Sequence, residues 1–122
     1  MSNATIVRSV PDYSAIGPLF QALSDPTRRA VVERLTRGPA SVSELARPFG
    51  MALPSFTQHL GVLERCGVVR SRKRGRVRTY ALETRPLAAA TDWLTQQRTT
   101  WERRLNQLDE YLHEDQDKEH TQ

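Results

Sequence analysis

Apolar residues recur at helical spacing through most of this chain, and only one short stretch has the composition of strands. The pattern predicts a helix over residues 13–23 and a second helix that begins at Pro26. Asp25 is a favourable N-cap residue and proline fits the first helical position, so this second start is well marked. The residues expected to be buried on these two helices are Ile16, Leu19, Phe20, Leu23, Val31, Val32 and Leu35.

Two shorter helices follow, separated by a tight break. Ser41 and Glu44 have the spacing of a capping box, so a helix should open there and end at Gly50. The next helix is predicted over residues 53–66, and its inward stripe consists of Phe56, Leu60 and Leu63. Its opposite face carries small or hydrogen-bonding residues in place of the usual Glu and Lys, namely Ser55, Thr57, Gln58, Gly61 and Arg65.

A hairpin rich in arginine comes next. Its two strands are predicted at 69–73 and 77–82, with a turn at 74–76. Six of the nine residues 70–78 are Arg or Lys. These charges would repel one another unless the hairpin faced anions. A hairpin with a purely structural role is the alternative.

The last helix is expected to begin after Pro86 and to carry a heptad seam. The seam positions are Leu87, Thr91, Leu94, Arg98, Trp101, Leu105, Leu108 and Leu112, of which Thr91 and Arg98 are not apolar. The helix is longer than a small core needs, so it should have a partner, either the first helix or a second subunit. We favour a homodimer, with the interface formed by Leu19, Leu94, Trp101, Leu105, Leu108 and Leu112.

The length of 122 residues suits one domain. Residues 1–12 are predicted to be a disordered arm, 13–114 the folded domain with its dimerisation helix at about 86–114, and 115–122 a disordered tail. Residues 1–85 carry 14 basic and 6 acidic residues, and the remainder carries 4 and 8, so net charges of +8 and −4 sum to the chain's +4. This asymmetry favours a polyanion-binding module joined to a segment with another role. The alternative is a solvated surface whose uneven charge has no binding role.

Several classes of protein are disfavoured by composition. No apolar run approaches the ~18 residues of a membrane span, and the first residues lack an apolar signal core, so a cytoplasmic location is expected. The single cysteine, Cys66, fits a reducing compartment. An enzyme is not expected, because there is no Gly-rich phosphate loop, no HExxH and no credible cysteine–histidine pair.

Three stretches together resemble the ArsR family of winged helix-turn-helix repressors. They read ALSDPTRRAVVERL, ASVSELA and LPSFTQHLGVLERCGVVRSRKRGRVRTYAL, and the resemblance spans Leu19 to Leu112. It implies a mainly α fold, with five helices and a two-stranded wing. It also implies a dimer on a palindromic operator, with helix 53–66 in the major groove and hairpin 69–82 on the backbone or in the minor groove.

The resemblance assigns DNA contacts residue by residue. The implied major-groove residues are Ser55, Thr57, Gln58 and His59, and the implied wing contacts are Arg72, Lys73, Arg74, Arg76 and Arg78. Gln58 can pair bidentately with adenine, the wing cations supply electrostatic affinity, and Arg76 is our choice for the minor groove. His59 lies at the flank of the face, where a bond to the neighbouring backbone is the alternative.

Metal sensing is common in the family, and this chain departs from both of its patterns. The cysteines of one site align with Ser41 and Ser43, whose hydroxyls are poor ligands for soft metals. The other site uses Asp and His pairs in the last helix, where this chain offers Asp92, Asp109, His113 and Glu114 without a second suitable histidine. We therefore expect no metal and no cofactor. A packing role is expected for Cys66, with a redox switch beside Arg65 as the alternative.

The sequence thus predicts a metal-independent, dimeric DNA-binding repressor, with autoregulation as one mode. The alternatives are a metal- or redox-responsive repressor of the same fold and a winged-helix protein-interaction module. Steep salt dependence of nucleic-acid binding would favour the first over the last. An inducer is not specified, and a small organic ligand near Trp93, Trp101 and Tyr111 stays open beside the simpler reading of these aromatics as core or interface.

Overall fold

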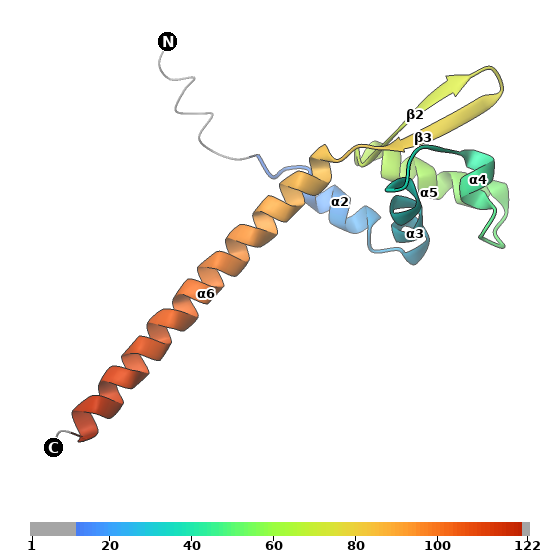
Figure 1. The fold of residues 1–122 in the computed structure, drawn as a ribbon. Coiled ribbons are helices and arrows are strands. Elements are labelled where there is room, and N and C mark those ends of the chain that lie inside the picture. Colours follow the sequence, from blue (N-terminus) through green and yellow to red (C-terminus); the bar gives the residue numbers. More distant parts are fainter. Residues whose placement is uncertain (1–11, 121–122) are drawn as a thin grey trace, which may run out of the picture. The chain divides into compact units, whose positions relative to one another are not determined.

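The computed structural model describes residues 12–120, and the side chains of residues 12–116. In this part of the chain there are five helices and three strands (Figure 1): α2 (Ile16–Ala22), α3 (Pro26–Leu35), β1 (Ala40–Ser41), α4 (Val42–Ala46), α5 (Leu53–Arg65), β2 (Val69–Arg74), β3 (Val77–Leu82) and α6 (Arg85–His120). The mainly helical fold with a small antiparallel sheet confirms the predicted class. The chain divides after Ala90 into two units, which we name the winged domain and the C-terminal segment.

Local capping signals fix the starts of two helices in the winged domain. The Asp25 carboxylate accepts the Arg28 N–H at 3.1 Å, as expected for the cap of α3. Ser41 and Glu44 form a complete capping box, because the Ser41 hydroxyl accepts the Glu44 N–H at 3.2 Å and the Glu44 carboxylate accepts the Ser41 N–H at 3.0 Å. The hydrogen bond from the Ser41 backbone holds the pKa of Glu44 below its ordinary value.

Two helices end elsewhere than the sequence suggested. α4 ends at Ala46 and not at Gly50, because Pro48 lacks the N–H that another helical turn would need. α6 continues to His120, past the predicted end near 114. Glu, Gln and Lys are good helix formers, so a highly charged stretch can extend a helix. The predicted arm lies outside the described residues, apart from Asp12.

The core of the winged domain confirms the inward stripe predicted for α5. Phe56, Leu60 and Leu63 have no exposed surface, and they belong to one buried cluster with residues from α2, α3 and the sheet. The Phe49 and Phe56 rings lie 5.4 Å apart between centroids. Leu19 is also completely buried in this core. Its side chain is therefore not available to a second subunit, which corrects its assignment to the dimer interface.

The sheet contains one strand more than the sequence analysis anticipated. β1 pairs antiparallel with β3, which gives the order β1-β3-β2. β2 and β3 form the wing, in a register that pairs Arg74 with Val77 and leaves a two-residue turn. The turn glycine, Gly75, has φ 63°, and no non-glycine residue described has a positive φ, so the turn is of type II′.

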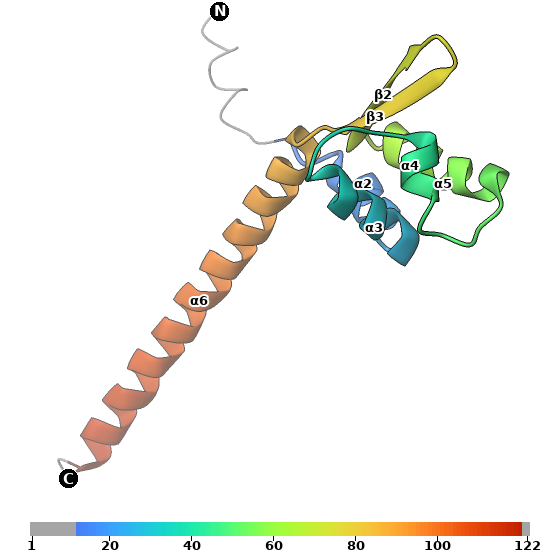
Figure 2. The same cartoon turned by 45° about the vertical axis from the view of Figure 1, so that its right-hand side comes forward.

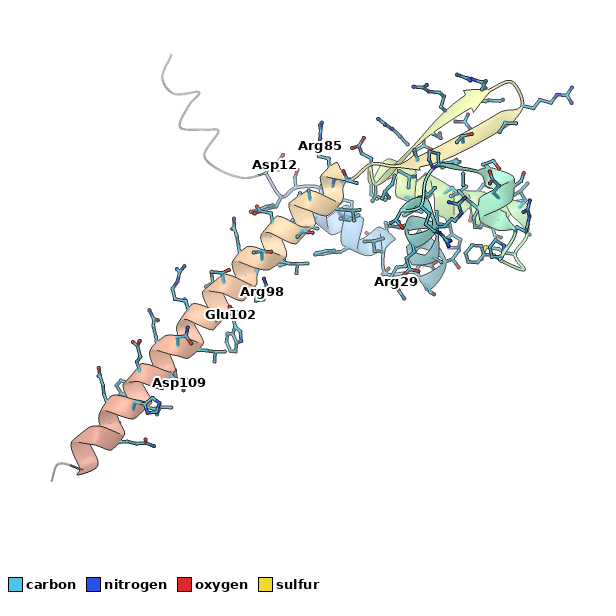
Figure 3. The ribbon with its side chains drawn as sticks, in the orientation of Figure 1. Asp12, Arg29, Arg85, Arg98, Glu102 and Asp109 are labelled. Atoms are coloured by element: carbon cyan, nitrogen blue, oxygen red, sulfur yellow. The ribbon has the colours of Figure 1, made fainter. Side chains whose placement is uncertain are left out.

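The C-terminal segment is a continuous helix with an exposed apolar stripe. Its exposed large apolar residues are Leu94, Trp101, Leu105, Leu108, Tyr111 and Leu112. Charged residues accompany them, among which Arg98 and Glu102 form an i,i+4 ion pair of 3.7 Å (Figure 3). Across residues 12–120, no helix combines the length and apolar character needed to cross a membrane.

Candidate nucleic-acid interface

The polar face of α5 lies on the surface of the winged domain. Ser55, Thr57 and Gln58 are exposed, whereas Phe56 and Leu60 on the same helix are buried in the core. No hydrogen bond to the Gln58 amide occurs among the described residues, so its donor and its acceptor are both available. The helix therefore presents hydrogen-bonding groups to solvent on the face opposite its fully buried stripe.

The Thr57 hydroxyl has a local partner. Its O–H donates to the Pro54 carbonyl oxygen at 2.9 Å, within the first turn of α5. A hydroxyl has a single proton, so in this rotamer Thr57 offers outward only its acceptor lone pairs and its methyl group. A methyl group suits apolar contact with thymine better than a bond to phosphate.

His59 is tied to α3 and not to the neighbouring backbone. Its Nδ1 lies 3.1 Å from Nη1 of Arg28 and 3.8 Å from the Asp25 carboxylate. The guanidinium can only donate, so Nδ1 accepts and the ring proton resides on Nε2. The side chain is 22% exposed. His59 thus keeps one N–H donor while it links the middle of α5 to the start of α3.

Arg28 is a key structural residue that the sequence analysis did not single out. Its Nε donates to the Ala22 carbonyl at 2.5 Å and its Nη2 to the Gln21 carbonyl at 3.3 Å. Together with the His59 contact, these bonds join the end of α2, the start of α3 and α5. Burial would raise the pKa of Asp25, but the hydrogen bond from the Arg28 backbone N–H and the positive charge of Arg28 outweigh it and lower that pKa.

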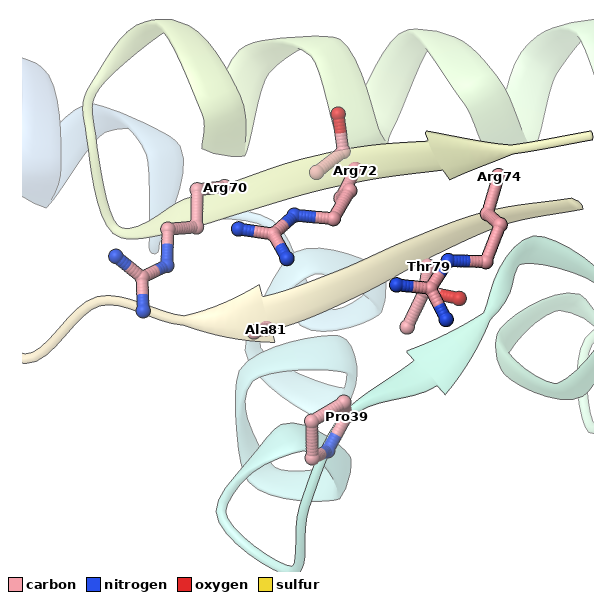
Figure 4. Close-up of a pocket in the computed structure, with 7 residues that line it drawn as sticks. Pro39, Arg70, Arg72, Arg74, Thr79 and Ala81 are labelled. Atoms are coloured by element: carbon pink, nitrogen blue, oxygen red, sulfur yellow. The ribbon is translucent and has the colours of Figure 1, made fainter.

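The wing cations lie on two faces of the hairpin. Strand alternation puts Arg70, Arg72 and Arg74 on the face opposite the buried Val69 and Tyr80. In Figure 4 these three side chains line a pocket of about 490 Å³, whose other lining residues are Pro39, Ser71, Thr79 and Ala81. We name this surface the outer wing face.

The remaining wing cations are on the core-facing side or in the turn. Lys73 pairs across the strands with Arg78, on the face that continues from Tyr80. Arg76 occupies the second turn position. Figures 1 and 2 both show the turn extending toward the same end of the winged domain as the N-terminus of α5. The turn of the wing and the start of α5 thus lie at one end of the winged domain.

Most of this positive charge is not neutralised within the described residues. Arg70 pairs with Glu83 at 3.4 Å. Arg78 donates to the Ser71 hydroxyl at 2.8 Å, and that hydroxyl donates to Glu64 at 2.9 Å. No ion pair to Arg72, Lys73, Arg74 or Arg76 is found in residues 12–116. The wing therefore carries an open cationic surface suited to phosphates.

Neither Cys66 nor the acidic residues build a second chemical centre in the described part of the chain. Cys66 is half-buried, and its thiol donates to the Leu63 carbonyl at 3.3 Å, as in the packing role expected for it. Among the described residues, no group of three or more His, Cys, Asp and Glu side chains could hold a metal ion.

An exposed polar helix beside a basic two-stranded wing, on a small helical core, defines a winged helix-turn-helix DNA-binding domain.

Comparisons with known proteins agree with this class of domain. Residues 23–72 match the family model of a helix-turn-helix domain. The chain is 46% identical over 77 residues to the HTH-type transcriptional regulator Rv2034 of Mycobacterium tuberculosis, covering 63% of this chain and 72% of that protein. It is 32% identical over 76 residues to the transcriptional repressor SdpR of Bacillus subtilis, covering 62% and 84%.

Solved structures give the same answer. A crystal structure of an ArsR family transcriptional regulator, RHA00566, superposes with a TM-score of 0.72 at 54% identity, covering 76% of this chain and 96% of that one. The chain therefore belongs to the ArsR family of helix-turn-helix transcriptional regulators. It is a DNA-binding regulator of transcription and not an enzyme, as the sequence predicted.

Proposed function

We propose that the protein represses transcription by binding a palindromic operator as a homodimer, without needing a metal. The observation that carries this proposal is the combination of the exposed Gln58 amide on α5, which has no hydrogen bond among the described residues, with the exposed cations of the wing. A two-fold dimer would present two such pairs to one DNA site at a fixed spacing, which suits a palindrome.

In this proposal α5 reads the major groove. Gln58 lies opposite the buried stripe and can pair with N6 and N7 of adenine. Ser55 offers a hydroxyl at the N-terminal end of the helix, and Thr57 offers its methyl group. His59 can donate its Nε2–H to a phosphate or a base edge while Nδ1 keeps its bond to Arg28.

The wing supplies affinity that does not depend on sequence. Arg72, Lys73, Arg74 and Arg78 are proposed to contact phosphates, and each contact releases condensed counterions. Arg76, at the second position of the turn, is proposed to enter the minor groove, where a narrow A-tract has enhanced negative potential.

Metal independence is supported by the role of Ser41. Its position aligns with a cysteine of the metal-sensing pattern, but here its hydroxyl accepts the Glu44 N–H and caps α4. The homodimer is supported by the exposed apolar stripe on the C-terminal segment, from Leu94 to Leu112.

Fluorescence anisotropy on labelled DNA tests the proposal. The duplex upstream of the protein's own gene would be compared with a scrambled duplex over a salt series, with EDTA and with zinc. We expect tighter binding to the upstream duplex, a steep fall in log K with log salt, and no effect of zinc or EDTA. Release by zinc would contradict metal independence, and the absence of binding at low salt would contradict the function itself.

The change Gln58→Ala should weaken binding to the cognate duplex by roughly 1–3 kcal/mol and relax sequence preference at one base pair. The reason is that alanine keeps the helix but removes both hydrogen bonds to the base. The measurement is the ratio of cognate to scrambled affinity, with Gln107→Ala, a Gln-to-Ala change in the C-terminal segment, as matched control. An equal loss on both duplexes would show that Gln58 does not read bases.

A further inference from the structure

The outer wing face carries a row of three arginines over a floor of small residues. Arg70, Arg72 and Arg74 alternate along β2, so their side chains lie on one side of the sheet, as Figure 4 shows. Successive arginines in the row are about 6.5 Å apart along the strand. The floor of the pocket that they line consists of Thr79, Ala81 and Pro39. Its volume of about 490 Å³ suits a small organic ligand.

The two ends of this row differ in charge. Arg70 is paired with Glu83 at 3.4 Å, so a carboxylate of the chain already faces its guanidinium. Arg72 and Arg74 have no ion pair among residues 12–116, and no acidic side chain lines the pocket. The row therefore has a neutralised end at Arg70 and an uncompensated cationic end at Arg72 and Arg74.

The floor of the pocket follows the same division. The strand register places Thr79 opposite Arg72 and Ala81 opposite Arg70. Thr79 adds a hydroxyl at the cationic end, and a hydroxyl can donate to an anion. Ala81 and Pro39 give the other end a small apolar surface. The flat guanidinium of Arg70 can stack on a planar ring that lies on this surface.

A phosphate chain joined to a planar ring is the chemistry that fits both ends of the pocket. A guanidinium binds phosphate oxygens through two parallel N–H donors, so Arg72 and Arg74 suit neighbouring phosphate groups. The row is about 13 Å long, so a single inorganic phosphate would occupy only part of it. We propose that the outer wing face binds a nucleoside triphosphate, with the phosphates at Arg72 and Arg74 and the base at the apolar end.

A ligand at this site would affect DNA binding. Arg72 and Arg74 are also proposed to contact the phosphates of the operator, and the negative charge of a bound nucleotide would repel those phosphates. The nucleotide would therefore compete with DNA and act as an inducer. This consequence rests on the proposed function, whereas binding of the nucleotide to the DNA-free protein does not.

Isothermal titration calorimetry of the full chain without DNA tests the site itself. ATP, tripolyphosphate and adenosine would be compared in EDTA at constant ionic strength. We expect one ATP to bind per chain, about tenfold more tightly than tripolyphosphate, which lacks the base. Adenosine should not bind measurably, because it lacks the phosphates. Equal affinities for ATP and tripolyphosphate would overturn the assignment of a nucleotide, and several ATP molecules per chain would show unspecific attraction to positive charge.

Two double variants separate the pocket from the charge of the hairpin. Arg72→Gln with Arg74→Gln should raise the dissociation constant for ATP by at least about tenfold. The matched control is Lys73→Gln with Arg76→Gln. It removes the same charge from the opposite face of β2 and from the turn, so ATP affinity should stay within about twofold. Equal losses in the two variants would overturn the proposal.

Fluorescence anisotropy on the upstream duplex tests the competition. ATP at saturating concentration should weaken DNA binding by the unmodified chain and have no further effect on the Arg72→Gln, Arg74→Gln variant. DNA binding that ignores saturating ATP would overturn the role as inducer. The two proposals fail separately. A chain that binds ATP but no DNA contradicts the proposed function, and a chain that binds DNA but no ATP contradicts the nucleotide site.

Discussion

Replacement of Arg72, Lys73, Arg74, Arg76 and Arg78 by glutamine is expected to weaken binding to operator DNA on the order of a thousandfold at physiological salt. The first four have no ion pair among the described residues, so their full charge is available to phosphates. Arg78 is partly engaged through Ser71 and Glu64. In a dimer the substitution removes ten positive charges from the proposed contact surface. Each lost phosphate contact also removes the favourable free energy that counterion release contributes to binding.

The salt dependence of binding is the sharper measurement. The slope of log K against log salt should become shallower by about 0.9 for every phosphate contact that is lost. The hairpin backbone should be preserved, because these side chains are exposed and Gly75 still forms the turn. A control variant would carry Arg37→Gln, Arg85→Gln and Arg103→Gln, three exposed arginines outside the wing. The two variants should be compared per charge removed. If the control loses as much affinity, or as much of the slope of log K against log salt, for each arginine replaced, then net charge and not the wing attracts the DNA.

Features set by neighbouring residues could be predicted from the sequence. The N-cap at Asp25, the capping box at Ser41 and the hairpin turn each depend on residues within a few positions of one another. The buried stripe of α5 was predictable as well. Over the thirteen residues of this helix, the large apolar residues at helical spacing fall on a single face, and that face must point inward. These local signals were sufficient to position the polar face of α5 and the basic wing.

Features set by distant residues could not be predicted. Arg28 and His59 are 31 positions apart, and nothing in the spacing of either indicates that they touch. β1 has only two residues, too few for the alternation that signals a strand. Leu19 lies on a stripe that suits either the core or an interface, and only the packing of α2 assigns it to the core. The wing cations form one cluster in sequence, but strand alternation divides them between two faces.

Leu60→Ala is expected to lower the free energy of unfolding of the winged domain by about 2–5 kcal/mol. Leu60 has no exposed surface and lies in the centre of α5, in the buried cluster that includes Phe56 and Leu63. The cost combines the lost burial of the side chain with a cavity that its neighbours fill only in part. Domains of this size are stable by only about 5–15 kcal/mol, so much of the total would be lost.

Leu53→Ala provides a control within the same helix. The chemical change is identical, but Leu53 is 55% exposed, so its substitution should cost well under half as much. Urea denaturation should be compared at equal subunit concentrations, because dimer formation adds a concentration-dependent term to stability. Equal losses would mean that α5 is not anchored through its inward stripe. A loss confined to Leu60→Ala would show that the helix proposed to read DNA is positioned by that stripe, so reduced DNA binding by this variant would follow from unfolding and not from a lost contact.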